Sequence, residues 1–289
     1  MSTEIALAII GGSGLYNISA LQNVEIFDLD TPYGKPSSPI RVGTLAGKRI
    51  AFLARHGIGH ILNPSEVNYR ANIYSLKMLG ATRLLAISAC GSLRDDFAPG
   101  HVVIPDQLLD FTRLRPRTFF GDGLVAHISS ADPFCPELST LLTRAVLQVD
   151  GVAHSSGKLI TIEGPRFSTK LESDLFRSWG LDIIGMTSSP EAFLAREAEI
   201  CYATMAHVTD YDVWHTSEEP VTVDMVVRTL HQNTALAQSA IHKLVGDLPS
   251  ETSCNCCNAL ENAIITDPAH ISPAARQKYQ LFISKYLQL

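Results

Sequence analysis

The 289-residue sequence predicts an α/β protein, namely a single-domain αβα sandwich with a central mixed sheet. Two observations support this fold class. Short apolar runs that stop at glycine or at a small polar residue alternate with segments of helical periodicity. No internal repeat or low-complexity tract interrupts the alternation. This arrangement is typical of helices that cover both faces of a mainly parallel or mixed sheet.

The strands are predicted where apolar residues run together and then stop. The first, residues 4–10, leads into the glycine-rich turn GGSG at 11–14. Helices are predicted where apolar residues recur at helical spacing, as in residues 68–79. The further predicted strands are 49–54, 84–88, 101–105, 183–186 and 200–208. The further predicted helices are 136–149, 170–179, 190–198, 223–244 and 273–287.

We expect residues 1–245 to form the main domain. Residues 246–289 would supply a cysteine-bearing linker and a C-terminal helical extension that packs on the same domain. Hydrophobic residues make up 46% of the chain and charged residues 18%, which is ordinary for a globular protein. No apolar run reaches the roughly 18 residues of a membrane span, and the N-terminus lacks a basic signal start. A cytoplasmic protein with no membrane partner is expected.

The formal net charge of −6 argues against nucleic acid as a partner, because no basic stripe could neutralise its phosphates. A small anion needs only one well-placed arginine. In α/β folds ligands bind beyond the carboxyl ends of the strands, so the residues that follow each predicted strand are the informative ones. They comprise hydroxyl donors, one arginine with its histidine neighbour, and small residues with accessible backbone: Ser13, Arg55, His56, Ser88, Ala89 and Thr187. Together they could hold one tetrahedral oxyanion.

The glycine-rich turn does not predict a dinucleotide site. The third glycine of that fingerprint would fall at position 17, which is Asn17, and no P-loop motif occurs in the chain. A dehydrogenase is therefore disfavoured. His56 and His60 are four residues apart, but they lie in a glycine-containing loop and no carboxylate completes a ligand set. No metal is predicted there.

Asp210 and Asp212 follow the predicted strand 200–208. If the strand continues through them, residues two apart point to the same face, so both carboxylates would project together and Tyr211 would turn away. Two adjacent carboxylates in a dry pocket can differ in their pKa values and act as acid and acceptor.

Long motifs in the same chain resemble those of the 5′-methylthioadenosine phosphorylases, a trimeric branch of the purine nucleoside phosphorylases. The resemblance runs in order from about residue 6 to about residue 245. The motifs are GGSGLY (11–16), ARHG (54–57), PSEVNYRAN (64–72), SACGSL (88–93), TIEGPRFS (161–168), MT (186–187) and TDYDVW (209–214).

The resemblance implies phosphorolysis of 5′-methylthioadenosine to adenine and 5-methylthioribose 1-phosphate. It assigns phosphate binding to Ser13, Arg55, His56, Ser88, the backbone of Ala89, and Thr187. Inorganic phosphate would be a co-substrate, with no metal or organic cofactor. The partners would be small molecules and further copies of the chain, in a homotrimer or a hexamer.

The resemblance also implies a place for each part of the nucleoside. Asp210, the catalytic candidate, would face purine N7, and Asp212 would face the 6-amino group. The other candidate substrate-binding residues are Phe167 and Ser168 at the purine, Met186 at the ribose, Val223, Val226 and Val227 at the methylthio group, His127 reaching a neighbouring subunit's substrate, and Tyr211.

These residue types suit the reaction. Cleavage of the N-glycosidic bond leaves negative charge on the purine, and a carboxylic acid near N7 can donate to it. Phosphate supplies both the nucleophile and a counter-charge for the cationic sugar. Three alternatives remain: a 6-oxopurine or methylthioinosine phosphorylase, which the acceptor Asp212 disfavours; a hydrolase, which would not need the anion clamp; and a non-catalytic nucleoside-binding protein.

Six cysteines are present, and three of them form the run Cys254-Asn255-Cys256-Cys257. Heat-adapted members of the family carry a similar run and internal disulfides, so the resemblance implies the pairs Cys135–Cys201 and Cys254–Cys256. Arg196 stands where the partner of the last cysteine would be. Reduced, buried thiols are the alternative. A zinc site of four ligands would need one from outside the run.

Overall fold

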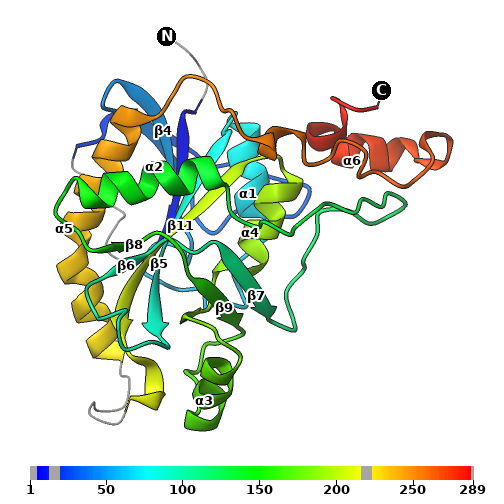
Figure 1. Cartoon of the computed structure of the whole chain (residues 1–289). Coiled ribbons are helices and arrows are strands. Elements are labelled where there is room, and N and C mark those ends of the chain that lie inside the picture. Colours follow the sequence, from blue (N-terminus) through cyan, green and yellow to red (C-terminus); the bar gives the residue numbers. More distant parts are fainter. Residues whose placement is uncertain (1–4, 13–19, 216–222, 288–289) are drawn as a thin grey trace.

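The computed structural model describes the backbone of residues 5–12, 20–215 and 223–287, and their side chains except for 223–232. Within these ranges a mixed sheet has helices on both faces, as the sequence predicts (Figure 1). The strands are β1 (Leu7–Gly11), β2 (Gln22–Phe27), β3 (Ile40–Leu45), β4 (Lys48–Ala54), β5 (Arg83–Ser92), β6 (Val102–Val103), β7 (Gln107–Phe111), β8 (Ala153–His154), β9 (Lys158–Ile162), β10 (Ile183–Gly185) and β11 (Cys201–Asp210). The helices are α1 (Tyr69–Met78), α2 (Pro136–Leu147), α3 (Lys170–Ser178), α4 (Ser188–Glu197), α5 (Val223–Asp247) and α6 (Pro273–Ile283), with short 3-10 turns η1 (Asp212–Trp214), η2 (Asn255–Asn258) and η3 (Pro268–His270).

Two apolar cores, one on each face of the sheet, hold the sandwich together. Strand β1 contributes to both, because all of its residues are buried and successive side chains point to opposite faces. Ala8 and Ile10 pack in a core shared with α1, α4 and α6. Leu7 and Ile9 pack in the other core, with α2 and α5. Burial on both faces explains why this strand is a continuous apolar run in the sequence.

The sheet opens at strand β5, and this opening positions the site. In the order β2-β3-β4-β1-β5-β10-β9-β7, β5 pairs in parallel with β1 as far as Ala86 and antiparallel with β10 from Gly91. On its other side it runs parallel to β11 from Arg83 to Gly91. Residues 87–90 therefore lie where β5 changes partner between β1 and β10.

Local capping determines where several helices begin and end. Asn68 accepts a hydrogen bond from the Ala71 amide at the start of α1, and Thr169 forms a capping box with Glu172 at the start of α3. At the far end of α5, Lys48 Nζ donates to backbone carbonyls of residues 245, 246 and 248. None of the helices in the described ranges combines the length and apolarity needed to cross a membrane.

Several strands were not predicted from the sequence. β2 lies at the edge of the sheet, pairs with β3 and has mostly exposed side chains, so its composition carries no burial signal. The predicted strand 84–88 extends to Ser92, because the change of partner keeps β5 extended. The closing helix α6 ends at Ile283 rather than at residue 287.

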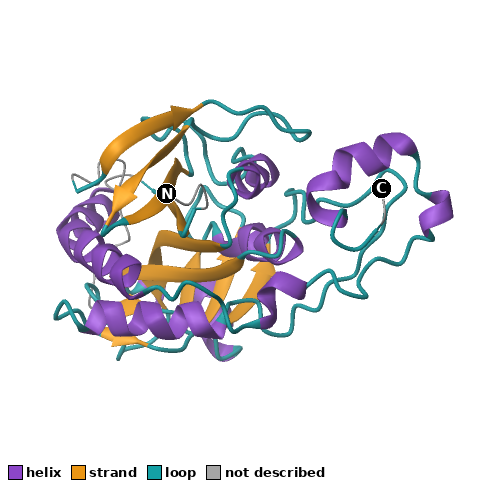
Figure 2. Ribbon diagram, turned by 90° about the horizontal axis from the view of Figure 1, so that it is seen from above, coloured by secondary structure: helices purple, strands orange, loops and turns teal. Residues whose placement is uncertain are grey.

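The C-terminal helix α6 stands to one side of the sandwich in Figure 2 and packs on the segment that follows β7. The ring centroid of Phe282 lies 4.6 Å from that of Phe119 and 5.4 Å from that of Tyr74. Tyr279 is fully buried, and its hydroxyl donates to the Gly121 carbonyl at 3.0 Å. Residues 273–283 therefore share a core with α1 and α4.

A buried ion pair joins the sheet to α4 at the opening. The Nε and Nη2 atoms of Arg55 each donate to a carboxylate oxygen of Glu191 at 2.9 Å, and both side chains are at most 1% exposed. Arg55 Nη1 donates to the Ile87 carbonyl, and the Tyr202 hydroxyl donates to Glu191 Oε1, each at 2.9 Å. These contacts tie the end of β4 to β5, β11 and α4.

Glu191→Gln is expected to destabilise the fold by roughly 3–5 kcal/mol, because it leaves the Arg55 charge buried without its counter-ion. The measurement is the free energy of unfolding in urea, at fixed protein concentration. Glu25→Gln is the matched control, since Glu25 is 63% exposed and pairs with Arg49 at 3.4 Å on the surface. It should cost about 1 kcal/mol or less. Equal effects of the two substitutions would contradict the structural role of the buried pair.

Candidate active site

A cavity of about 780 Å³ lies at the opening of the sheet. Its floor is the stretch of β5 from Ile87 to Gly91, and its walls come from the loop after β4, the loop after β9 and the ends of β10 and β11. The sequence-predicted residues that line it are Arg55, His56, Ser88, Ala89, Phe167, Ser168, Met186, Thr187, Asp210 and Asp212. Segments distant in the sequence are thus brought to one enclosed space of the size of a small-molecule site.

The predicted anion-binding residues gather at this cavity with one exception that cannot be placed. Arg55, His56, Ser88, Ala89 and Thr187 all line it. Ser13 lies outside the described residues, although the adjacent Gly12 lines the cavity.

The bidentate edge of the Arg55 guanidinium faces the protein. This edge binds Glu191, because a fully buried arginine requires a buried counter-ion. Burial lowers the pKa of Arg55 and the Glu191 carboxylate raises it more, so the net pKa lies above the ordinary value. The second hydrogen of Nη2 donates to the Ile10 carbonyl at 3.4 Å, and one of the two hydrogens of Nη1 donates to the Ile87 carbonyl. The arginine therefore offers the cavity a permanent charge and at most one donor.

His56 is held in one tautomer by its backbone contact. Its Nδ1 lies 2.9 Å from the Leu62 carbonyl, which can only accept, so the proton is on Nδ1. Burial, with the nearby Arg55 charge, lowers the pKa of His56 to about 4. A neutral ring then has Nε2 as an acceptor. His60, which also lines the cavity, stacks on His56 with ring centroids 4.3 Å apart.

The two aspartates reach the cavity, but the expected extended geometry is wrong. Asp210 is the last residue of β11, whereas Asp212 begins η1 with φ of 50°, a conformation that aspartate tolerates better than most residues. The Asp212 amide donates to Asp210 Oδ1 at 2.8 Å and closes this turn. A turn, not a shared strand face, brings the two carboxylates together. Tyr211 points elsewhere, since its ring stacks on His215 and it does not line the cavity.

One oxygen of Asp212 is left without a partner. Oδ2 is buried and makes no hydrogen bond within the described part of the chain. Burial raises the pKa of Asp212 to about 6; the Ser173 hydroxyl acts to lower this pKa, and the charge of Asp210 acts to raise it. An unpaired buried acceptor costs free energy unless a ligand donates to it. The nearby Ser168 Oγ, which also lines the cavity, is likewise buried without a partner among the described residues.

Besides Tyr211, four candidate substrate-binding residues are not among the described residues that line the cavity. The valines Val223, Val226 and Val227 lie in the first turns of α5, where side chains are outside the described residues. His127 is exposed and does not line this cavity; its amide donates to the Ala263 carbonyl beside the C-terminal extension.

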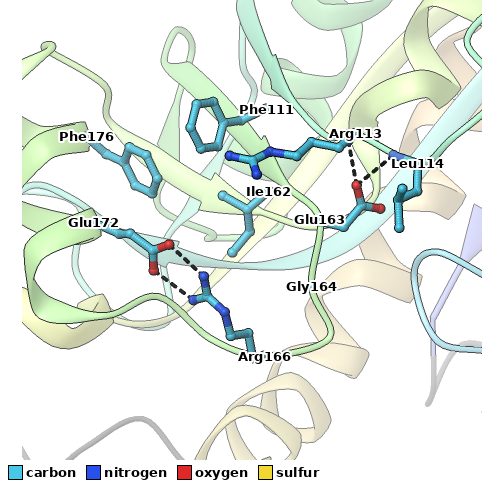
Figure 3. Close-up of a pocket in the computed structure, with 9 residues that line it drawn as sticks. All are labelled: Phe111, Arg113, Leu114, Ile162, Glu163, Gly164, Arg166, Glu172 and Phe176. Atoms are coloured by element: carbon cyan, nitrogen blue, oxygen red, sulfur yellow. Dashed lines mark hydrogen bonds and ion pairs between the residues drawn. The ribbon is translucent and has the colours of Figure 1, made fainter.

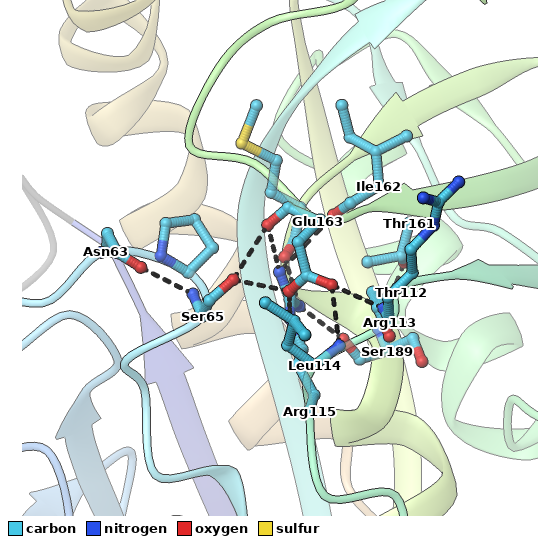
Figure 4. A network of polar contacts seen from close by, with 12 residues as sticks. Asn63, Ser65, Thr112, Arg113, Leu114, Arg115, Thr161, Ile162, Glu163 and Ser189 are labelled. Atoms are coloured by element: carbon cyan, nitrogen blue, oxygen red, sulfur yellow. Dashed lines mark hydrogen bonds and ion pairs between the residues drawn. The ribbon is translucent and has the colours of Figure 1, made fainter.

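A polar network fixes the wall that carries Met186 (Figure 4). Glu163 accepts from the Ser65 hydroxyl, from two backbone amides at 113 and 114, and from Arg115. Burial raises the pKa of Glu163, but these hydrogen bonds together lower it by more, so that the net pKa is about 2. Arg115 donates in turn to the carbonyls of Met186 and Ser189, each at 2.7 Å. The network joins the loop after β7 to both sides of Thr187.

Glu163 and Arg166, three residues apart, do not pair with each other, since Glu163 binds Arg115. Arg166 pairs with Glu172 at 2.7 Å because the capping box of α3 places that carboxylate beside it. Arg166 and Glu172 line a second cavity of about 370 Å³, which is shown in Figure 3. This second cavity shares Ile162 with the larger one. This smaller cavity holds none of the predicted site residues.

Sequence reasoning missed several residues that form the larger cavity. Glu191, which binds Arg55 but does not itself line the cavity, lies in the predicted helix 190–198, where its single signal was an acidic residue among the apolar and small residues Pro190, Ala192 and Leu194. Cys90 and Gly91 were read as parts of a motif, and they line the floor. A Cβ at Gly91 would lie 3.0 Å from Asp210 Oδ1, so a larger residue here would displace this carboxylate slightly.

The chain is similar to known phosphorylases along its whole length. A family model described as the phosphorylase superfamily matches residues 6–246. An S-methyl-5′-thioadenosine phosphorylase of Geobacter sulfurreducens is 49% identical over 285 residues, covering 98% of this chain and 100% of that protein. One from Hyperthermus butylicus is 50% identical over 268 residues, covering 91% of this chain and 97% of that protein.

Solved structures agree with these relatives. A methylthioadenosine phosphorylase from an antarctic soil metagenomic library superposes with a TM-score of 0.92 at 46% identity, covering 97% of this chain and 99% of that one. A methylthioadenosine phosphorylase from Schistosoma mansoni in complex with adenine gives a TM-score of 0.84 at 34% identity. The match covers 99% of this chain and 100% of that one. With a family model across most of its length and relatives of this identity, the chain belongs to the phosphorylase superfamily.

Proposed function

We propose that this protein cleaves 5′-methylthioadenosine with inorganic phosphate, giving adenine and 5-methylthioribose 1-phosphate. The observation that carries the proposal is the unpartnered, buried Oδ2 of Asp212 in the same cavity as Arg55, His56 and Thr187. An acceptor for an amino group and a set of donors for an oxyanion are what this pair of substrates requires. The relatives named as S-methyl-5′-thioadenosine phosphorylases support the same reaction.

Phosphate would be held by side chains that differ in their roles. The hydroxyls of Ser88 and Thr187, the Ala89 backbone and Ser13 would donate to its oxygens, and Arg55 would supply the positive charge. Because His56 is neutral with its proton on Nδ1, Nε2 would accept from the hydroxyl of hydrogen phosphate. This contact would orient the unprotonated phosphate oxygens toward the sugar, where their charge stabilises the developing cation.

At the purine, Asp210 would donate a proton or a strong hydrogen bond to N7. The Thr209 hydroxyl lies 2.7 Å from Asp210 Oδ2 and 3.2 Å from the Cys90 carbonyl, and it has a single hydrogen for these two neighbours. When that hydrogen points to the carbonyl, a proton on Asp210 Oδ2 would be held by the Thr209 oxygen until the purine binds, and the same proton would then be donated to N7. Thr209 would therefore act as a positioning residue for the protonated acid, which is the form that assists departure of the purine.

The other parts of the nucleoside would meet mainly apolar surface. Phe167 and Ser168 would border the purine and Met186 the ribose, in agreement with their place in the cavity wall. We place the methylthio group against Val223, Val226 and Val227. His127 would complete the site of a neighbouring subunit in a homotrimer or a hexamer, which accords with its exposure away from its own chain's cavity.

The reaction so described requires phosphate as co-substrate and no organic cofactor or catalytic metal. We propose that the catalytic domain comprises residues 1–245, with 246–289 as an extension of it. The family model, which ends at residue 246, supports this boundary.

Adenine release from methylthioadenosine is expected only when inorganic phosphate is present. Thr187→Val, which removes one donor at nearly constant volume, should raise KM for phosphate by roughly tenfold, from the 1–1.5 kcal/mol of one hydrogen bond. KM for the nucleoside should change little. Release without phosphate, at an unchanged rate, would identify a hydrolase and overturn the proposal; absence of turnover with binding retained would identify a nucleoside-binding protein.

Asp210→Asn is expected to lower kcat by roughly 10²–10⁴-fold, because an amide cannot transfer a proton to N7. KM for phosphate should stay close to that of the wild type. Asp174→Asn, the same change at an exposed position of α3, serves as the control. A variant with near-normal kcat would remove Asp210 from the chemical step.

Asp212→Asn is expected to shift preference from methylthioadenosine toward methylthioinosine by roughly 10- to 100-fold in kcat/KM, the effect of 1–3 kcal/mol for an inverted buried hydrogen bond. In the wild type, the ratio of kcat/KM for methylthioadenosine to kcat/KM for methylthioinosine should fall as the pH drops through about 6. The reason is that protonated Asp212 can donate to a 6-oxo group. The variant should lose this pH dependence of the ratio. An unchanged preference at pH 8 would contradict the role of Asp212.

A further inference from the structure

Four of the six cysteines converge away from the active-site cavity. The sulfurs of Cys135, Cys201, Cys254 and Cys256 all lie within 4.8 Å of one another. Cys254 Sγ is 3.2 Å from Cys201 Sγ and 3.6 Å from Cys135 Sγ. They come from the start of α2, the start of β11 and the segment before and within η2. In the described part of the chain this is the one group of at least three cysteine, histidine or acidic residues spaced to share an ion.

The spacing suits a tetrahedral ion. Zinc–thiolate bonds of about 2.3 Å place sulfurs about 3.8 Å apart at the corners of a tetrahedron. The separations of 3.2 and 3.6 Å, within an overall limit of 4.8 Å, lie around this value. Three of the four residues are buried and Cys254 is partly exposed, which leaves an entry path but no open position for a substrate.

The surroundings contain N–H donors that suit thiolate ligands. The Leu138 amide in the first turn of α2 donates to Cys135 Sγ at 3.5 Å, and Arg196 Nη1 donates to Cys256 Sγ at the same distance. Hydrogen bonds of this kind disperse the negative charge of metal-bound sulfur and orient the ligands. The Arg196 cation is especially suitable, because four thiolates around a divalent ion leave a net charge of about −2.

The other two cysteines stand apart. Cys257 is exposed and its sulfur faces the Cys254 carbonyl at 3.9 Å, while Cys90 lines the active-site cavity. The ligands that the C-terminal run lacks are therefore supplied by Cys135 and Cys201. The fold brings these residues to the run because the amides of Ser253 and Cys254 and the Ser253 hydroxyl all donate to Glu137 Oε2.

We propose that Cys135, Cys201, Cys254 and Cys256 form a structural site for a divalent ion of the zinc type, which holds the segment after α5 against α2 and β11. The predicted disulfides Cys135–Cys201 and Cys254–Cys256 are not formed in the structure, where all six cysteines are free thiols. Cys254 lies close to both Cys135 and Cys201, so the arrangement does not favour two separate pairs. The site is independent of the proposed reaction and differs from the expectation that the chain binds no metal.

The first experiment uses the full, untagged chain produced in zinc-supplemented medium and purified without chelator. Metal is measured by elemental analysis, and thiols are counted under denaturing conditions with a chelator present. We expect about one zinc per chain and six thiols. Two thiols without zinc, those of Cys90 and Cys257, would establish disulfides and overturn the proposal. Six thiols without zinc, even after incubation with the metal, would overturn it as well.

The second experiment uses substitutions with a matched control. Cys254→Ser and Cys256→Ser should each reduce bound zinc at least tenfold. Cys257→Ser is the matched control, because Cys257 follows Cys256 directly but lies outside the cluster, and this variant should retain the zinc. A chelator should lower the melting temperature of the wild type and of Cys257→Ser. If the first two variants fail to fold, cobalt replaces zinc in the wild type: the absorption typical of tetrahedral cobalt thiolate supports the site, and its absence contradicts it.

Discussion

The buried ion pair between Arg55 and Glu191 is the interaction on which the arrangement of the site depends. Isolated, either charge would be expensive to bury, so the two must be placed together. Arg55 also donates to the Ile87 carbonyl at the point where β5 leaves β1, and Glu191 accepts from Tyr202 on β11. The pair therefore connects the opening of the sheet with the helix that follows Thr187. The orientation of the Arg55 charge is therefore set by contacts within the protein.

The change of partner along β5 explains why residues so distant in sequence meet. If β5 paired with one strand throughout, its middle would be covered on that edge. Instead, residues 87–91 form the floor of a cavity, and β10 delivers Met186 and Thr187 from the opposite direction. β11 stays paired with β5 to the end, so Asp210 arrives beside Gly91. The absence of a side chain at Gly91 leaves room for that carboxylate.

The sequence was sufficient to predict the αβα class, most helices and part of the set of residues that line the cavity, because buried strands and the residues after them carry clear composition signals. It did not reveal the edge strand β2, whose side chains are exposed. It also gave the wrong geometry for Asp212, because the Asp212 amide donates to Asp210 Oδ1 and closes a local turn in place of an extended strand. It did not reveal Glu191 as the partner of Arg55, because that contact joins residues 136 positions apart and no local pattern encodes it.

The segment from residue 112 to residue 135 links the catalytic wall to the C-terminal extension. At one end Arg115 binds the carbonyls of Met186 and Ser189; in the middle Phe119 packs on Phe282 of α6; at the other end Cys135 joins the cysteine cluster. A loop of this length would otherwise be a poor support for a wall of an active site. Only the contact of Phe119 with Phe282 and the approach of Cys135 to Cys254 and Cys256 involve residues after 245, so the C-terminal segment packs on the same stretch of chain whose other end binds the wall at Met186.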